Sequence, residues 1–364
     1  MNKIYYCKIY KTSTGLCNQL FSLISAMIIA IKQNKEIIIV DQFLNDYEKQ
    51  NFSNISDIID LKKWNIFLEK NYNIRMVDKN KVSFKVNNVK YGAQGKYLDI
   101  IDKIMERFCN NNTVFIDKNI DINLLAGEDP LPFVKKEVIV NYSVNDHGVE
   151  EAFEEEYTCL KQVIQFDLSK EEFVYLFHWI NTLDKSLFNI LLKSIPFTDT
   201  FTTLSQIFID NKNIDVNQKI NVLHLRIEDD AIAHWSVQNR MDSRNFQKIL
   251  ELKYISLIQK HIKKNDINII LSYSTENGVL DYLKQNGYTC HFTDKIMGAG
   301  REINALIDLH IGGFCNNIFI GNFNISGLNG SSLSYYLLNK LSDKKVKQVL
   351  IDLDDISKKS YTNF

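Results

Sequence analysis

A buried strand that leads directly into charged residues is the feature of this sequence best suited to chemistry. The apolar residues Val222, Leu223 and Leu225 predict the strand, and four polar residues lie where it should end: His224, Arg226, Glu228 and Asp229. In an open α/β sheet, ligands bind beyond the carboxyl ends of the strands. An arginine there matches two phosphate oxygens with its planar fork of donors. The stretch therefore predicts an anion site, and a plain surface ion pair of Arg226 is the alternative.

A second stretch suited to anions is the loop of residues 15–19, which contains Gly15 and Asn18 and precedes a predicted helix that ends at residue 32. A helix N-terminus presents free backbone N–H groups and the positive end of the helix dipole. The loop is not the dinucleotide fingerprint, because only one of the three required glycines is present. A simple helix cap is the alternative interpretation.

A third stretch lies near the C-terminus. A predicted strand at residues 317–321 leads through a loop rich in Gly, Asn and Ser into a helix whose first turn carries Ser331 and Ser332. Hydroxyls and free N–H groups at a helix start predict a second phosphate cradle. Each serine taken singly could instead be a cap.

Together, the three stretches resemble the GDP-fucose-dependent fucosyltransferase superfamily, which includes the α1,2-, α1,6- and protein O-fucosyltransferases of GT-B-like fold. GLCNQLF from residue 15 is similar to the family's G-x-G-N-Q-[ML]-F opening, and HLRIED from residue 224 to its H-x-R-x-G-D/E motif. SSLSYY from residue 331 is similar to the S-[ST]-F-S-W-W segment of the α1,2 branch. Asp308 stands where several branches carry an aspartate before the last strand.

The resemblance implies a role for each donor-side residue. Arg226 would hold the β-phosphate of GDP, and His224 and Asp308 would contact the guanine or the ribose. Ser331 and Ser332 would hydrogen-bond the diphosphate. The physical chemistry agrees, because a leaving diphosphate gathers negative charge and a fixed guanidinium stabilises that charge where it develops.

The reaction implied by the resemblance is an inverting transfer of L-fucose from GDP-fucose to a glycan or protein hydroxyl, with no metal and no other cofactor. Gly15 and Asn18 would line the sugar and acceptor side of the site. The acceptor hydroxyl needs a proton sink, for which Glu228 or Asp229 is the expected group.

Four departures from the family pattern leave the branch and the acceptor open: Cys17 for the second glycine, Glu228 for the glycine before the aspartate, Tyr335 and Tyr336 for the double tryptophan, and extra residues between Gly321 and Ser331. They also leave two alternative functions open. One is a transferase that uses another nucleotide sugar, and the other is a non-catalytic relative that binds a nucleotide sugar or a glycan.

The elements that hold these stretches are expected to form an α/β fold of two Rossmann-like, doubly wound domains facing a cleft, as in GT-B enzymes. Strands separated by helices in residues 220–351 imply parallel pairing. These residues are expected to form the C-terminal Rossmann-like domain that binds the nucleotide sugar. Residues 1–210 are expected to form an N-terminal α/β domain on the acceptor side, and residues 352–364 a tail. The polar residues 210–219 predict a linker, the acidic residues 150–156 a solvated helical face, and residues 169–180 a helix.

Composition limits the partners. A net charge of -1 over 364 residues argues against nucleic acid, which selects basic surfaces. The six cysteines form no CxxC pair, so neither a zinc site nor a disulfide framework is indicated. No apolar run is long enough to cross a bilayer and the start shows no signal region, so we expect a cytoplasmic protein. The expected partners are a nucleotide-sugar donor and a glycan or glycoconjugate acceptor.

Overall fold

The computed structural model divides the chain into two compact units, neither of which is continuous in sequence. Unit 1 combines Met1–Ile9, Ser25–Phe43 and Asn54–Leu176, and unit 2 combines Tyr10–Ile24, Leu44–Ser53 and Phe177–Phe364. Helix α1 (Leu16–Lys32) contributes residues to both. The structure describes residues 3–10, 15–46, 49–110, 113–132, 134–145, 147–156, 159–160, 164–167, 174–175, 184–296, 299–324, 329–353 and 356.

A parallel sheet with the strand order β17-β16-β15-β18-β20 forms the centre of unit 2. Its strands are β15 (Ile220–His224), β16 (Ile267–Leu271), β17 (Cys290–Phe292), β18 (Ile318–Asn324) and β20 (Lys347–Ile351). Every residue of β15, β16 and β18 is buried, as continuous apolar runs predict for strands covered on both faces. The parallel pairing expected for this region is confirmed.

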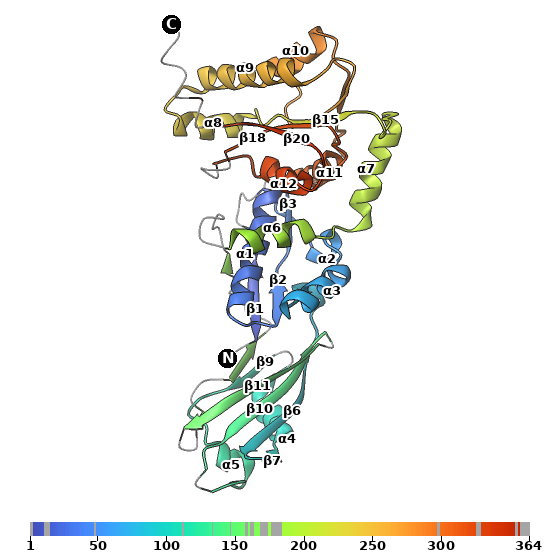
Figure 1. Cartoon of the computed structure of the whole chain (residues 1–364). Helices are drawn as coiled ribbons and strands as arrows, with labels where there is room; N and C mark the ends of the chain where they lie inside the picture. Colours follow the sequence, from blue (N-terminus) through green and yellow to red (C-terminus); the bar gives the residue numbers. More distant parts are fainter. Residues whose placement is uncertain are drawn as a thin grey trace. The chain divides into compact units, whose positions relative to one another are not determined.

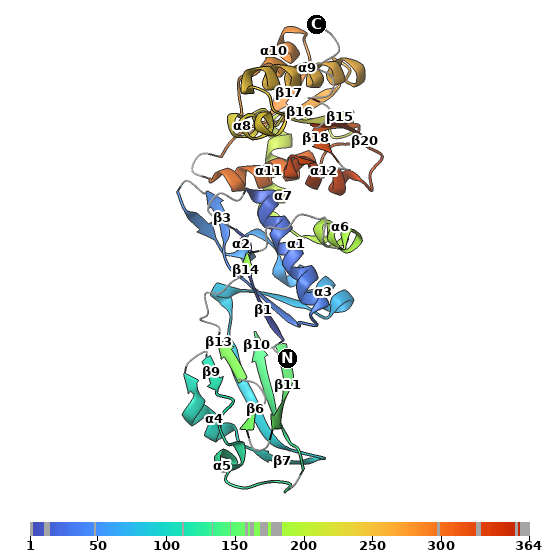
Figure 2. The ribbon, with the colours of Figure 1, turned by 90° about the vertical axis from the view of Figure 1, so that its left-hand side faces the viewer.

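Helices cover both faces of this sheet (Figure 1 and Figure 2). One face carries α8 (Asp229–Gln238), α9 (Ser243–His261) and α10 (Gly278–Gln285). The other carries α11 (Arg301–Gly312) and α12 (Ser332–Leu341), against which α7 (Asp199–Asn211) and α6 (Lys185–Ser194) pack. Trp235, Phe246 and Tyr254 fill the core between α8, α9 and the sheet. The sequence patterns did not predict α7. The predicted linker of residues 210–219 begins inside this helix, which ends at Asn211.

Unit 1 contains a second parallel sheet in the order β14-β1-β2-β5. Its strands are β1 (Ile4–Lys8), β2 (Ile37–Val40), β5 (Arg75–Asp78) and β14 (Val174–Tyr175), with α2 (Ile55–Ile58) and α3 (Leu61–Tyr72) between β2 and β5. The predicted helix of residues 169–180 lies outside the described residues except for β14, which is a strand. A short ribbon of β3 (Phe43–Asp46) and β4 (Asn51–Ser53) lies in the same part of the chain.

An antiparallel sheet in the order β12-β11-β10-β6-β7 completes unit 1 and shares one apolar core with β1 and β2. Its strands are β6 (Phe84–Ala93), β7 (Lys96–Asp99), β10 (Glu137–Val144), β11 (His147–Glu156) and β12 (Cys159–Leu160). Beside it lie β8 (Cys109–Asn110), β9 (Thr113–Ile116), β13 (Ile164–Asp167), α4 (Ile101–Phe108) and α5 (Ile122–Ala126). The acidic residues 150–156 are therefore strand, and the helix predicted for them is wrong.

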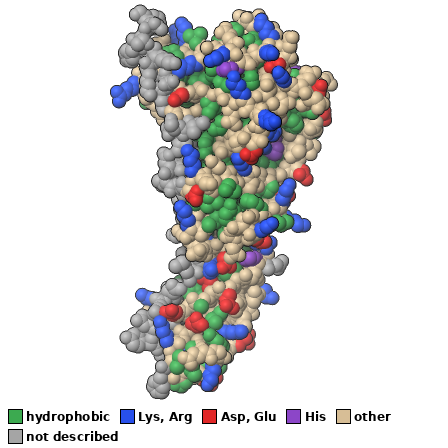
Figure 3. All heavy atoms as spheres, in the orientation of Figure 1, with side chains coloured by type: hydrophobic (Ala, Val, Ile, Leu, Met, Phe, Trp, Pro, Cys, Tyr) green, Lys and Arg blue, Asp and Glu red, His purple; other side chains and the backbone are tan. Residues whose placement is uncertain are grey.

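The expected α/β class is confirmed, with helices on both faces of the unit 2 sheet and a parallel sheet in unit 1. Within the described part of the chain, every helix is too short or too polar to span a membrane. Acidic and basic side chains are interspersed over the face shown in Figure 3. Of the expected tail, residues 354–355 and 357–364 lie outside the described residues.

Candidate functional site

A pocket lies in unit 2 where several helices begin; we call it the unit 2 pocket. Leu16, Arg301 and Ser332, the first residues of α1, α11 and α12, all line it. So does Glu228, the residue immediately before α8. Helix N-termini carry unpaired N–H groups and a partial positive charge. Their convergence makes the pocket a favourable place for an anion.

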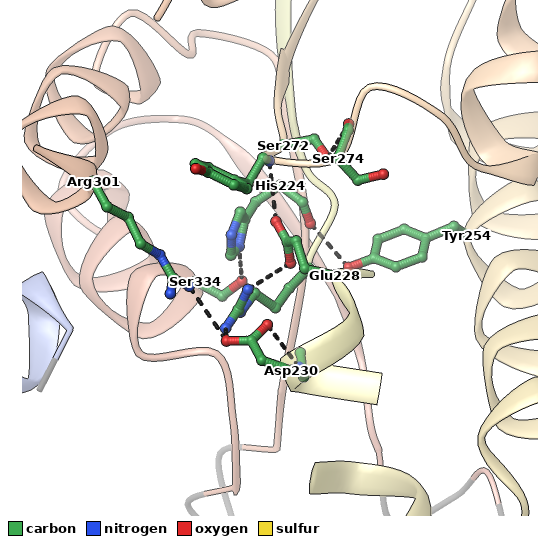
Figure 4. Close-up of polar contacts among 11 residues, drawn as sticks. His224, Glu228, Asp230, Tyr254, Ser272, Ser274, Arg301 and Ser334 are labelled. Atoms are coloured by element: carbon green, nitrogen blue, oxygen red, sulfur yellow. Dashed lines mark hydrogen bonds and ion pairs between the residues drawn. The ribbon is translucent and has the colours of Figure 1, made fainter. Parts of the chain in front are cut away.

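Arg226 lies two residues beyond β15 and is fixed by two carboxylates. The two residues that supply them, Glu228 and Asp230, are labelled in Figure 4. Arg226 Nη1 donates to Glu228 Oε2 at 2.6 Å and Arg226 Nη2 to Asp230 Oδ2 at 2.8 Å. Burial alone would lower the pKa of Arg226, but Glu228 and Asp230 raise it above its ordinary value. Arg301 adds a second cation, 3.3 Å from Asp230 Oδ2. The guanidinium is therefore permanently charged and held in one orientation.

His224, the last residue of β15, is buried and neutral. Burial lowers its pKa to about 3, and the charges of Arg226 and Lys295 contribute. Its Nδ1 lies 2.7 Å from Ser334 Oγ, which also accepts the backbone N–H of Asn322 at 3.2 Å. A serine hydroxyl has one donor and two acceptor lone pairs, so either Ser334 or His224 can be the donor in this contact, and Nε2 is left for a ligand.

The loop of residues 15–19 is held in place by buried hydrogen bonds. The Leu16 N–H donates to Glu302 Oε2 at 2.9 Å. Gln19 is fully buried and pairs with the backbone of Leu44 in both directions, at 2.8 Å and 2.9 Å. Gly15 lines the unit 2 pocket, whereas Asn18 does not and its carbonyl accepts the Ser22 hydroxyl. The loop thus presents its backbone to the pocket.

The start of α12 supplies hydroxyl groups. Ser331 occupies the N-cap position, yet its side chain makes no capping hydrogen bond. Its backbone N–H donates to Asn322 O at 3.0 Å. Both Ser331 and Ser332 line the unit 2 pocket. The Ser331 hydroxyl is thus not used as a cap, which removes the alternative considered for it.

Asp308 lies in α11 and lines the same pocket, where its Oδ2 accepts from Lys295 Nζ at 3.2 Å. Burial raises the pKa of Asp308, and Lys295 opposes the shift. Lys295 also lies 5.5 Å from the ring centre of Tyr273, and the Arg301 guanidinium lies 5.6 Å from the same ring. Tyr273 is 59% exposed, so an aromatic ring flanked by cations borders the pocket.

The structure brings together most of the residues singled out from the sequence. Lining the unit 2 pocket are Gly15, His224, Arg226, Glu228, Asp308, Ser331 and Ser332. Two others, Asn18 and Asp229, do not line it. Sequence patterns missed Tyr273, Lys295, Arg301 and Glu302, which also line it. Tyr273 could have been anticipated, because it follows β16, whose carboxyl end shares a sheet edge with that of β15.

Comparison with known proteins identifies structural neighbours only. No protein-family model and no curated protein sequence matches the chain. A crystal structure of POFUT1 in complex with GDP is similar with a TM-score of 0.49 and 10% sequence identity, over 96% of this chain and 98% of that chain. A crystal structure of POFUT1 in complex with GDP-fucose is similar with a TM-score of 0.46 and 9% identity, over 96% of each chain. At these values the likeness assigns neither a family nor a ligand to this chain.

Proposed function

We propose that this chain is a glycosyltransferase that moves L-fucose from GDP-fucose to a hydroxyl group of a glycan or a protein. The observation that carries the proposal is the convergence of Arg226 and the starts of α1, α11 and α12 on one pocket. The stretches that resemble the fucosyltransferase motifs are far apart in the chain, yet each contributes to this pocket. Such a site suits a ligand with clustered negative charge, as a nucleoside diphosphate has.

The proposed chemistry depends on stabilising the leaving group. Transfer breaks the bond between the anomeric carbon and the β-phosphate oxygen, and the bonding electrons leave with GDP. A guanidinium has five N–H donors, and Glu228 and Asp230 occupy two of those of Arg226. The remaining donors, the first N–H groups of α12 and the hydroxyls of Ser331 and Ser332 would hold the diphosphate as its charge increases.

The nucleoside end is proposed to lie near His224 and Asp308. Guanine presents N–H donors on its base-pairing edge, for which the Asp308 carboxylate is a suitable acceptor. The neutral His224 ring, held at Nδ1 by Ser334, would present Nε2 to the ribose or the base. Gly15 and Asn18 remain proposed for the sugar and acceptor side, which the backbone of the loop would border.

The proposal includes an inverting and metal-independent reaction, with GDP-fucose as substrate and no further cofactor. In the part of the chain that the structure describes, no three His, Cys, Asp or Glu side chains are grouped to hold a metal ion. Arg226 and the helix N-termini would supply the positive charge that balances the diphosphate. Inversion would follow from attack by the acceptor on the face of the sugar opposite GDP.

A thermal-shift panel tests the donor. GDP at about 100 times its Kd should stabilise the protein by about 2.7 kcal/mol, which gives a measurable rise in Tm. UDP and ADP at the same concentration should stabilise the protein less, because they share the diphosphate but their bases lack the donor pattern of guanine. Equal stabilisation by UDP would point to another nucleotide sugar. Stabilisation by GDP without any release of GDP from GDP-fucose would favour a non-catalytic relative.

A further inference from the structure

Glu302 is a buried carboxyl group at the unit 2 pocket that the donor-side chemistry does not use. It lies in the first turn of α11, is 3% exposed and lines the pocket. Its Oε2 accepts the Leu16 N–H at 2.9 Å. Its Oε1 is buried and has no hydrogen-bond partner among the described residues. A buried polar atom without a partner has a free-energy cost, and a catalytic role is one of the reasons for which such an atom is retained.

We propose that Glu302 is the general base that accepts the proton of the acceptor hydroxyl. The proposal rests on the fucosyltransferase function proposed above. In the step, the acceptor oxygen forms a bond to the anomeric carbon of the sugar as the bond from that carbon to the β-phosphate oxygen breaks. The hydroxyl proton moves to Glu302 Oε1, and the bonding electrons leave with GDP. The products are the fucosylated acceptor, GDP and a protonated Glu302.

The carboxyl groups first expected to act as the base are placed less favourably. Both oxygens of Glu228 are engaged, Oε2 by Arg226 at 2.6 Å and Oε1 by the Tyr273 N–H at 3.0 Å. Asp229 is the first residue of α8 and does not line the unit 2 pocket. Glu302 has one oxygen fixed by Leu16 and one oxygen without a partner in the described chain. A base needs both a fixed orientation and a free lone pair.

Gly15 lies beside the Glu302 carboxyl group. The neighbour that a Cβ added at Gly15 would meet within 4 Å is Glu302 Oε2, the oxygen that accepts the Leu16 N–H, at 3.9 Å. The missing side chain therefore leaves the backbone of the loop open at this point. The resemblance assigns Gly15 to the acceptor side of the site. The Glu302 carboxyl group, which lies beside Gly15, is therefore on that side as well.

The surroundings of Glu302 also suit proton transfer near neutral pH. Burial raises the pKa of Glu302 to about 7, while the Leu16 N–H, Arg301 and Arg226 oppose the shift and Asp46 adds to it. The Cys17 thiol on α1 also faces it and stays protonated, because burial raises the pKa of that thiol. A base whose pKa lies close to the working pH transfers protons efficiently and is still largely ionised above it.

The test uses Glu302→Gln, since glutamine keeps an oxygen for the Leu16 N–H but cannot take up a proton. The rate of GDP release from GDP-fucose is followed with the simple sugar that stimulates it most, or with water if none does. We expect kcat to fall by about 10²-fold or more, with the affinity for GDP unchanged. The wild-type rate should rise through about pH 7 to a plateau, and the variant should lose this rise. Glu276→Gln, an exposed glutamate of the same unit, is the matched control.

Two results separate this proposal from the one on which it rests. If wild-type protein turns over GDP-fucose and Glu302→Gln keeps both the rate and its rise with pH, Glu302 is not the base and the fucosyltransferase function stands. If the variant loses GDP affinity as well as rate, Glu302 is structural and the general-base role is wrong. If the wild-type protein neither binds GDP nor turns over GDP-fucose, both proposals fail.

Discussion

Arg226 is held in position by carboxylates before any ligand binds. Glu228 and Asp230 fix the plane of its guanidinium, and Glu228 is itself held by the backbone of Tyr273. A group that is already oriented needs no rearrangement when charge develops on the leaving phosphate. An ion pair of Arg226 was the alternative to an anion site. The two interpretations are compatible, because Glu228 and Asp230 orient the guanidinium and accept from only two of its five N–H donors.

Replacement of Arg226 tests this role. We expect Arg226→Ala to lower fucose transfer by roughly 10²-fold or more, because a donor to the leaving group is lost where charge develops. Steady-state kinetics with GDP-fucose measure the effect. Arg244→Ala is the control, since Arg244 is an exposed arginine of α9 that does not line the unit 2 pocket. Near-normal transfer by a folded Arg226→Ala protein would contradict the role of Arg226.

His310 should make stability depend on pH. It contacts the rings of Phe197 and Phe201, and its buried Nε2 has no partner in the described chain. Burial lowers its pKa to about 3, and Lys340 contributes. The unfolded chain therefore takes up a proton below about pH 6.5 that the native state does not, so stability falls by about 2 kcal/mol between pH 6.5 and pH 5.

His310→Phe removes this proton and keeps a ring of similar shape. Urea unfolding gives the unfolding free energy of the variant and of the wild type at each pH. The difference, variant minus wild type, should increase by about 2 kcal/mol between pH 6.5 and pH 5. His224, which has a shift of the same sign, is present in both proteins and cancels in the difference. Glu302 has the opposite sign and cancels as well. A stability difference that does not change with pH would show that His310 takes up its proton as readily in the native state as in the unfolded chain.

At the element scale, Gly321 allows α12 to approach β18. A Cβ at this position would lie 2.6 Å from Ser334 Oγ and 2.9 Å from the ring of Phe319. Ser334 is the residue that contacts His224 Nδ1. Because Gly321 has no side chain, α12 lies close enough to β18 for Ser334 to contact His224. The packing of α12 therefore affects the orientation of His224 in the unit 2 pocket.

Gly321→Ala should push α12 away from the sheet. We expect a loss of about 1–3 kcal/mol of unfolding free energy, as for other overpacked cores, together with weaker GDP binding. Urea unfolding and a GDP titration measure the two effects. Gly148→Ala is the control, because a Cβ there meets nothing within 4 Å. Unchanged stability and unchanged GDP affinity in Gly321→Ala would contradict this account of the helix packing.

Several elements could be predicted from local pattern and others could not. Apolar runs predicted β15 and β18, and helical spacing predicted α1 and α12, because these signals are local. β11 was missed because Glu151 is buried and interrupts the apolar alternation of Val149 and Phe153. Glu151 is tolerated there because Oε1 accepts from the Tyr142 hydroxyl at 2.6 Å and the Lys3 N–H at 2.8 Å. Such compensation depends on contacts that sequence spacing does not contain.

At the scale of the whole molecule, the unit 2 pocket is assembled from segments far apart in sequence. Residues 10–24 belong to unit 2, where Leu16 contacts Glu302 and the ring of Phe21 lies 5.7 Å from that of Tyr335. The motif resemblance predicted that Gly15, Arg226 and the serines of α12 share a site. It could not predict Glu302, whose position depends on the start of α11 meeting the start of α1.

The measurement that most directly tests the proposed function is release of GDP from GDP-fucose by the purified protein in the presence of EDTA. A panel of simple galactosides and N-acetylglucosaminides is added in parallel. We expect GDP release without any metal ion, and stimulation by one of these sugars would identify the acceptor class. No release of GDP from GDP-fucose, with or without the sugars, by a protein that GDP stabilises would contradict the fucosyltransferase assignment.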